Sequence, residues 1–544
     1  MRMLLSRYRL IFILALGLLL VVLLLNEHLI PAGDNATYLI LSQSLVTGHG
    51  YRMISDPRTP EMALYPPGYP LLLAGVLVLT GTVHDLVAAI LPIKVVSIAL
   101  YLGAIVLAYD IFRRRSTTLA TITALLMAVN PHVLHFATEV GTEIPCLFFS
   151  LCCIWLFERY WQETSMGSLL WVALFLVLTF YARSIALVIA AVFTFYLFAR
   201  RKFKHALLLL FIVGMLMAPW FIRSSLLTET GTSVGLGRSY FALYFSSDPY
   251  GTTRANLSDW IARLAQNLRI YALDIWPDVL FPHALSAGVL LGPGGIVFTG
   301  LITALLMLGF ILEARRGHVS EWYVAIFFAS CIGYLWAQSR LIVPIIPFAI
   351  YYLLVTVNFL LQVVCSRRFR AKERTEVRTT NNAKAYALTL ACSVLMLSAL
   401  VIDARHIQRN LCYGFGHPLA TYYAADAEWR NYLHAMNWIA QDTAERSIVM
   451  CRKADLLYVL TGHQALEYPY STDAAELMNA VHDNCVSYVI EDAFSWTRTT
   501  AQYLQPALQA WLTMDPEALS LVYETDAPRT RIWHVNKLEQ ERRN

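Results

Sequence analysis

Long runs of apolar residues, interrupted by short basic stretches, fill the chain up to about residue 403. Each run has about 15 to 25 residues, close to the roughly 20 that a helix needs to cross a bilayer. We read such runs at 10–26, 86–112, 117–134, 143–160, 169–182, 184–199, 206–223, 288–312, 322–338, 341–363 and 386–403. The pattern predicts a polytopic α-helical membrane protein with about eleven transmembrane helices.

The composition supports this fold class. Hydrophobic residues make up 57% of the 544 residues, charged residues make up 15%, and the mean hydropathy is +0.53. A soluble domain of this size does not need so much apolar sequence to form its core. The net charge of +5 comes with no basic-aromatic binding module, so we expect no nucleic-acid partner.

Basic clusters follow alternate apolar runs and predict the topology. Because short basic loops stay in the cytoplasm, the N-terminus should be cytoplasmic and the tail after residue 403 should lie outside. The run at 10–26 predicts a first membrane anchor rather than a cleaved signal peptide, because it is long and no small-x-small cleavage site follows it. The clusters are "RRRS" at 113–116, "RRKFKH" at 200–205, "ARRGH" at 314–318 and "SRRFRAK" at 366–372.

This topology divides the chain into a membrane domain, 1–403, with outer loops at 27–85 and 224–287, and an extracytoplasmic domain, 404–544. In the tail, helical stretches alternate with β-rich runs such as "SIVMC" and "VSYVIED", which predicts a small α/β domain. No glycine-rich phosphate loop follows a strand, so no nucleotide site is expected. In the first loop, "ALYPPGYPLLLAGVLVLTG" is too short to span and predicts a shallow or re-entrant helix.

The cysteines form no CxxC pair. Cys146, Cys152 and Cys153 lie in an apolar run and are expected to be small core residues. Cys412, Cys451 and Cys485 lie in the tail, where three thiols allow at most one disulfide, and we assign none.

Asp34 opens a short helical stretch just after the first apolar run. Tyr38, Leu41 and Leu45 follow it at helical spacing and form one apolar stripe. The carboxylate is either the N-cap of this helix or a general base at the membrane surface. A base at this level suits a lipid-linked substrate whose reactive atom lies among the headgroups.

Glu139 and Glu143 lie four residues apart in "NPHVLHFATEVGTEIP" and would share one face of a continuous helix. They are either interfacial acids near a positive helix end, or groups that bind acceptor hydroxyls or a divalent metal. The metal is the weaker alternative, because hard cations need several oxygen ligands.

Arg340 and Arg183 each separate two apolar runs. Each either extends its charge toward the membrane surface or holds a phosphate through its planar donors. His49, between two glycines, and Tyr65, before two prolines, are either turn residues or contacts to a sugar or acceptor.

Four ordered motifs resemble those of a known group of enzymes. They are "GDNATYLILSQSLVTGHGY", "YPPGYPLLLAG", "ATEVGTEIP" and "QSRLIVPIIPF". With the predicted topology they make the chain resemble the GT-C glycosyltransferases, in particular the bacterial families similar to protein O-mannosyltransferases and to the aminoarabinose transferase that modifies lipid A. The resemblance covers about residues 1–403, and "WIAQDTAERSIVMCRKADLLYVLTGHQ" resembles the outer α/β tail of such enzymes.

The resemblance implies a reaction and roles for its residues. The donor would be a polyprenyl-phosphate sugar, and the acceptor a hydroxyl of a lipid, glycan or protein at the outer face of a bacterial inner membrane. Asp34 would be the catalytic base and Arg340 would contact the lipid phosphate. Position 35 is Asn, so a double-acid motif is absent and Glu139 or Glu143 would have to supply a second carboxylate. This departure weakens the case for a tightly bound metal.

A single displacement at the anomeric carbon would invert its configuration, and the loop at 224–287 together with the tail is expected to set acceptor specificity. The competing class is a transporter or lipid-linked glycan flippase, which is also polytopic and basic on the inside. Such proteins often show internal repeats and mid-membrane acids, whereas here the acids gather at one predicted surface and no repeat is evident. A scaffold or sensor with a ligand-binding tail is a third class.

Overall fold

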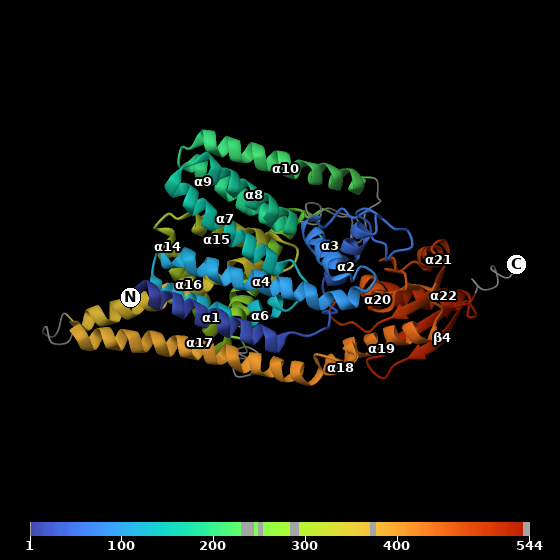
Figure 1. Ribbon diagram of the computed structural model, residues 1–544. Helices are drawn as coiled ribbons and strands as arrows, with labels where there is room; N and C mark the ends of the chain where they lie inside the picture. Colours follow the sequence, from blue (N-terminus) through green and yellow to red (C-terminus); the bar gives the residue numbers. More distant parts are fainter. Residues whose placement is uncertain (1, 230–243, 248–253, 283–292, 370–376, 537–544) are drawn as a thin grey trace. The chain divides into compact units, whose positions relative to one another are not determined.

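The computed structural model describes residues 2–229, 244–247, 254–282, 293–369 and 377–536 (Figure 1). The chain forms two compact units, each built from segments that are distant in sequence. The first, here called the helical unit, comprises residues 1–25, 94–223 and 239–408. The second, here called the α/β unit, comprises residues 26–93, 224–238 and 409–544.

Helices of very different length make up the helical unit (Figure 1). Helix α4 begins, and helices α10 and α17 end, in segments that belong to the α/β unit. The helices are α1 (Arg2–Leu24), α4 (Leu86–Arg113), α5 (Thr117–Ala128), α6 (Pro131–Ala137), α7 (Glu143–Glu163), α8 (Met166–Ala182), α9 (Leu187–Ala199), α10 (Phe203–Glu229), α12 (Leu257–Ile270), α13 (Trp276–Leu280), α14 (Pro293–Ala314), α15 (Val319–Gly333), α16 (Ile346–Phe369) and α17 (Val377–Tyr413).

Each predicted apolar run contains a helix, but the count of eleven spans is not confirmed. Within the described residues, five helices are long and apolar enough to cross a membrane: α4, α7, α10, α14 and the stretch Ser339–Val363. Helices α5 and α6 make a sixth if they count as one span, bent by 58°. These helices, with the sequence pattern, identify an integral membrane protein.

Local breaks explain why several runs are shorter than predicted. Pro131 begins α6, and the Asn130 side chain caps that helix by accepting a hydrogen bond from the Val133 amide at 3.1 Å. The predicted span at 322–338 instead ends with α15 at Gly333, and Tyr334 is extended. The next run starts as a 3-10 helix, η3 (Ser339–Ile345), which contains a proline. Residues 283–287 of the second outer loop and 288–292 of the run at 288–312 lie outside the described residues.

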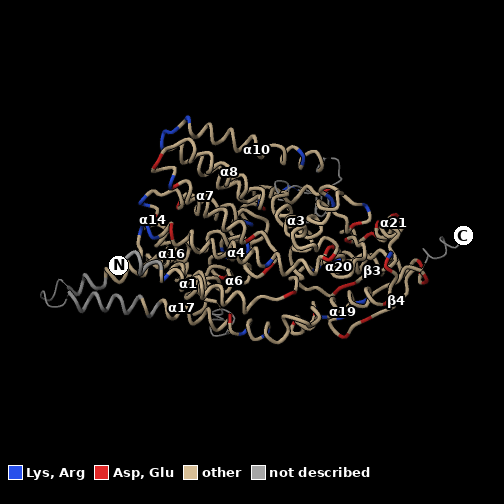
Figure 2. Tube along the Cα trace, in the orientation of Figure 1, with Lys and Arg blue, Asp and Glu red and all other residues tan. Residues whose placement is uncertain are grey.

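Basic residues concentrate at the end of the helical unit where α4 ends and α10 begins (Figure 2). There Arg115 is buried and donates to Glu321 at 2.7 Å, Glu313 at 3.3 Å and Ser320 at 2.6 Å. Burial alone would lower the pKa of the Arg115 guanidinium, but neighbouring groups, chiefly Glu321 and then Glu158, together outweigh burial and raise that pKa. These contacts hold the loop after α4 against α14 and α15.

The α/β unit contains the predicted small sheet. Its five strands are ordered β2-β1-β3-β5-β4, with β1 parallel to β2 and β3, and β5 antiparallel to β3 and β4. The strands are β1 (Ile448–Met450), β2 (Ala465–Leu466), β3 (Val486–Glu491), β4 (Leu519–Glu524) and β5 (Arg531–Val535). The helices are α2 (Asn35–Val46), α3 (Gly68–Thr80), α18 (Leu419–Tyr422), α19 (Ala427–Asp442), α20 (Ala454–Thr461), α21 (Ala474–Asp483) and α22 (Gln505–Met514).

The first outer loop packs on the sheet domain within this unit. Helix α2 lies against α20, where Thr37 donates to the Asp455 carboxylate and Ser55 donates to the same group at 3.4 Å. The Ala465 amide of β2 donates to the Ser55 carbonyl at 2.8 Å. The loop that follows the first apolar run and the C-terminal tail therefore form one compact body.

The short helix after the double proline is present as α3. Its 13 residues, Gly68–Thr80, lie between Pro67 and Gly81, whose φ of +70° is in the left-handed region that favours glycine. Its shallow or re-entrant placement in the membrane stays a prediction.

Helices α14 and α16 pack so closely that one position of α14 has room only for glycine. A Cβ at Gly309 would overlap the backbone carbonyl of Tyr352, whereas a Cβ at Gly300, on the same helix, would meet no atom within 4 Å. We expect Gly309→Ala to lower the free energy of unfolding by about 1–3 kcal/mol through overpacking, and Gly300→Ala to be neutral or stabilising. Thermal unfolding of both variants in nanodiscs measures this difference, and equal midpoints would contradict the packing described.

Candidate active site

A buried carboxylate lies between two guanidinium groups in the helical unit. The Glu143 Oε1 atom is 2.7 Å from Arg183 Nη1 and 2.9 Å from Arg340 Nε. The side chains of Glu143 and Arg183 are 5% and 12% exposed, whereas that of Arg340 is 27% exposed. The structure therefore brings together three residues that the sequence had placed in separate motifs.

Three helix ends position these side chains. Glu143 is the first residue of α7, and Arg183 follows α8 in an extended conformation that breaks the helix before the 3-10 segment η1 (Ser184–Ala186). Arg183 Nη1 also donates to Thr142 Oγ1 at 3.0 Å. Arg340 lies in the first turn of η3. The backbone is irregular next to each of these three residues. Their long side chains can therefore converge without a helix lying between them.

Planar donor groups converge at this carboxylate. The guanidinium groups of Arg183 and Arg340 both face Glu143 in a largely buried setting. Fixed donors of this kind are suited to a phosphate or another oxyanion.

Glu139 and Glu143 do not share a helical face, so the continuous-helix interpretation is wrong. Helix α6 ends at Ala137 and α7 begins at Glu143, which leaves Glu139 in the connection. The Glu139 carboxylate lies 3.7 Å from the amino group of Lys94, a fully buried residue of α4. Each acid thus has its own cationic neighbours.

This arrangement does not fit a divalent metal. A cation at Glu139 or Glu143 would be repelled by Lys94 or by the two arginines. Among the residues that the structure describes, no group of three or more His, Cys, Asp or Glu side chains is placed to hold a metal ion.

Asp34 lies at the head of α2 in the α/β unit. It occupies the N-cap position, but its side chain makes no capping hydrogen bond. The half-buried carboxylate instead interacts electrostatically with Lys453, the residue before α20. The geometry therefore does not support capping as the role of this side chain.

Two charged groups on the adjoining segment have shifted pKa values. Burial and the neighbouring Arg452 hold the pKa of Lys453 below its ordinary value, and Asp34 acts in the opposite direction. Burial raises the pKa of the Asp455 carboxyl to about 6, against the effect of the hydrogen bond from Thr37.

His49 and Tyr65 both lie in the first outer loop. His49 is exposed, and its ring accepts from or donates to Thr47 Oγ1 at 2.8 Å within a turn between two positive-φ glycines. The Tyr65 ring packs edge-on against Tyr38 at 5.1 Å between centroids. Substrate contact by either residue stays a prediction.

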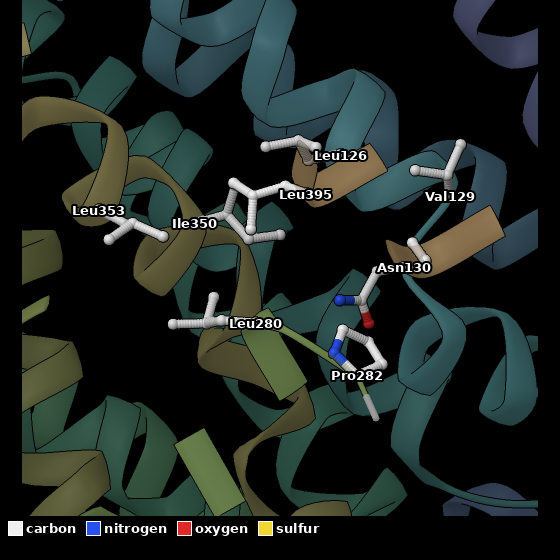
Figure 3. A pocket seen from close by; sticks show the side chains of 9 residues that line it. Leu126, Val129, Asn130, Leu280, Pro282, Ile350, Leu353 and Leu395 are labelled. Carbon is white, nitrogen blue, oxygen red and sulfur yellow. The ribbon is translucent and has the colours of Figure 1, made fainter. Parts of the chain in front are cut away.

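A small, open pocket in the helical unit has an apolar lining (Figure 3). Its polar residue, Asn130, donates to the Val279 carbonyl at 2.8 Å and accepts from the Val133 amide. The lining residues are Leu126, Val129, Asn130, Leu280, Pro282, Ile350, Leu353, Leu395 and Ala399. This lining offers no acid, base or cation for catalysis.

Sequence reasoning missed Lys94 and Lys453. Lys94 carries a usable signal, because an isolated lysine within the apolar run 86–112 is a functional candidate by default. Lys453 carries none, because the tail holds many charged residues and only folding places this one beside Asp34.

Removing the central carboxylate should destabilise the helical unit. Glu143→Gln removes the carboxylate that both guanidinium groups contact, and we expect a loss of roughly 3–5 kcal/mol in the free energy of unfolding. Glu163→Gln, at the other end of α7, removes an exposed pair with Arg159 and should change little. Thermal unfolding of both variants in nanodiscs provides the measurement, and similar midpoints would argue against a structural role for the buried pair.

Stability should depend on pH through Asp455. Its pKa of about 6 in the folded protein lies above the ordinary value of 3.8, so the folded state binds this proton more tightly than the unfolded state. The contribution is present below pH 3.8 and is lost as the pH rises through about 6. We expect the unfolding midpoint of the wild type to fall more steeply over this range than that of Asp455→Asn. The exposed Asp483→Asn serves as control, and parallel profiles of wild type and Asp455→Asn would refute the assignment.

A family model matches part of the chain. Residues 65–222 match the model described as dolichyl-phosphate-mannose-protein mannosyltransferase. This segment includes Lys94, Glu139, Glu143 and Arg183, whereas Asp34 and Arg340 lie outside it. Comparison with curated proteins finds no significant match.

Solved structures share the fold over almost the whole chain. The oligosaccharyltransferase of Archaeoglobus fulgidus in the apo form is 13% identical, with a TM-score of 0.57 over 98% of this chain and 74% of that one. The archaeal oligosaccharyltransferase AglB from Archaeoglobus fulgidus, in complex with an inhibitory peptide and a dolichol-phosphate, gives a TM-score of 0.55 at 13% identity and the same coverage. ArnT from Cupriavidus metallidurans bound to undecaprenyl phosphate is 12% identical, with a TM-score of 0.55 over 97% of this chain and 98% of that one.

The matched segment and the shared fold agree with the motifs in the sequence, and the protein resembles the GT-C glycosyltransferases, including the protein mannosyltransferase and ArnT types.

Proposed function

We propose that the protein is a membrane glycosyltransferase that moves a sugar from a polyprenyl-phosphate donor to an acceptor hydroxyl. The observation that carries this proposal is the group of Arg183 and Arg340 around the single carboxylate of Glu143. The planar donors of these two arginines suit the phosphate of a lipid-linked donor. The partial exposure of Arg340 leaves part of its side chain accessible to such a ligand.

The related structures support the class of donor. AglB has been solved with a dolichol-phosphate and ArnT with undecaprenyl phosphate. Both lipids end in a phosphate at the membrane surface. A donor of this kind brings its own activated leaving group, so the absence of a glycine-rich phosphate loop in the sequence agrees with the proposal.

In the proposed reaction, the acceptor hydroxyl oxygen attacks the anomeric carbon as the bond from that carbon to the phosphate oxygen breaks. The electron pair of the broken bond stays on the phosphate, where Arg340 and Arg183 stabilise the added charge. The Asp34 carboxylate takes the proton of the hydroxyl. One displacement inverts the anomeric configuration. Lys94 and the two arginines disfavour a metal at Glu139 and Glu143.

Acceptor choice is assigned to the second outer loop and the C-terminal tail. The loop carries aromatic residues in its described part, including Phe245 and Trp260, whose ring centroids lie 5.6 Å apart. Residues 230–243, 248–253 and 283–287 of this loop lie outside the described residues. The acceptor class is a lipid, glycan or protein hydroxyl, and the setting is the outer face of a bacterial inner membrane with a cytoplasmic N-terminus.

The deciding experiment uses the full chain in nanodiscs with a panel of radiolabelled polyprenyl-phosphate sugars and a membrane extract as the source of acceptors. Transfer of label to an extract component would establish the reaction and identify the donor. Movement of intact lipid-linked sugar across a proteoliposome membrane, without transfer, would instead favour the flippase alternative and overturn the proposal.

Asp34→Asn should reduce kcat/KM by about a hundred- to ten-thousand-fold, because a general base contributes roughly this factor. The unfolding midpoint should fall only slightly, because Asp34 is half-buried and makes no capping bond, although its charge beside Lys453 is lost. Glu61→Gln, which removes a partly exposed acid paired with Arg52 in the same loop, should retain activity. Activity that persists in Asp34→Asn would assign the base to another residue.

A further inference from the structure

Helix α12 has its polar and apolar faces reversed relative to a helix on the surface of a soluble protein. Leu257, Ile261, Leu264 and Leu268 recur at helical spacing and form one stripe along it, here called the α12 stripe. These side chains are 77%, 60%, 41% and 51% exposed. A row of large aliphatic side chains left outside the protein marks a surface for a partner.

The polar residues of α12 face the protein instead. Arg263 is 8% exposed and donates to the backbone carbonyls of Tyr244, at 2.9 Å, and Ser246. Asn267 is 4% exposed and donates to the carbonyls of Ile332 and Tyr334 at 2.8 and 2.7 Å. These bonds fix the rotation of the helix about its axis, so the α12 stripe cannot turn inward without breaking them.

A third face completes the helix. Ser258, Gln266 and Arg269 are exposed on the side of the α12 stripe away from the buried polar residues. Around the axis, the helix therefore presents one face to the protein, one apolar face and one polar face. This is the arrangement of a helix that lies in a membrane surface, with hydrocarbon on one side and water on the other.

Length and neighbours identify hydrocarbon as the occupant. The helix has 14 residues and is about 21 Å long, too short to cross a bilayer. It packs against α15 and continues into the π-helical segment η2 (Tyr271–Ile275), which packs on the membrane-spanning α14. The exposed Arg269 next to the α12 stripe would meet lipid phosphates.

We propose that α12 is an interfacial membrane helix that inserts the α12 stripe into the hydrocarbon edge of one leaflet while its polar face stays in water. The proposal concerns a lipid surface and is independent of the reaction proposed for the protein.

The test places a nitroxide label on each exposed face of α12. Leu264→Cys and Leu268→Cys report on the α12 stripe, and Ala262→Cys and Gln266→Cys are matched controls on the polar face. The full chain, with the exposed Cys412 and Cys485 replaced by Ser, is reconstituted in nanodiscs of phosphatidylethanolamine and phosphatidylglycerol. The unfolding midpoint of each variant confirms that it folds like its parent, and the parent without a new cysteine corrects for labelling elsewhere.

Relaxation by oxygen, which concentrates in hydrocarbon, is compared with relaxation by a nickel chelate, which stays in water. We expect the oxygen-to-nickel ratio to be several-fold higher at 264 and 268 than at 262 and 266. Equal ratios on both faces would place the α12 stripe in water and overturn the proposal. Protection of 264 and 268 from both reagents would show that a second copy or another protein covers the stripe, which also overturns it.

Discussion

Charge buried among apolar helices is the constraint on which the helical unit depends. Glu143 lies at the start of a membrane-spanning helix, where an unpaired carboxylate would be strongly unfavourable. Arg183 and Arg340 offset that cost at 2.7 and 2.9 Å, and each reaches the carboxylate only because its helix is interrupted. The breaks after α8 and before α16 are therefore part of the same arrangement as the ion pairs.

Hydrogen bonds also connect the segment between α15 and Arg340 to α12 and the segment that follows it. Asn267 bonds to the carbonyls of Ile332 and Tyr334 at the end of α15, and the Tyr271 hydroxyl bonds to the backbone of Gln338 at 3.3 Å. Gln338 lies two residues before Arg340. The second outer loop thus holds the backbone that carries one of the two guanidinium groups. This contact gives the loop a structural role in addition to the acceptor role proposed for it.

The predicted acids acquired different surroundings in the folded chain. Helical spacing suggested that Glu139 and Glu143 act as a pair, but the break between α6 and α7 gives each acid its own cation. Asp34 could be predicted as a candidate from its place after the first apolar run. The neighbouring Lys453 could not be predicted, because it reaches Asp34 through contacts between distant parts of the chain. The contact of Thr37 with Asp455, for example, joins residues 418 positions apart. Spacing within one segment carries no information about such partners.

The sequence by itself determined where the helices and strands form. Apolar runs become helices because backbone groups in hydrocarbon must bond within their own segment, and the β-rich runs of the tail became β1, β3, β4 and β5. Only the tertiary structure decided which charges pair and which faces are buried. Glu143 meets Arg340 across 197 positions, and Arg263 and Asn267 of α12 face inward because they donate to backbone carbonyl groups outside their own helix. Both outcomes follow because polar groups removed from water need hydrogen-bond or charge partners, and these partners come together only when the whole chain folds.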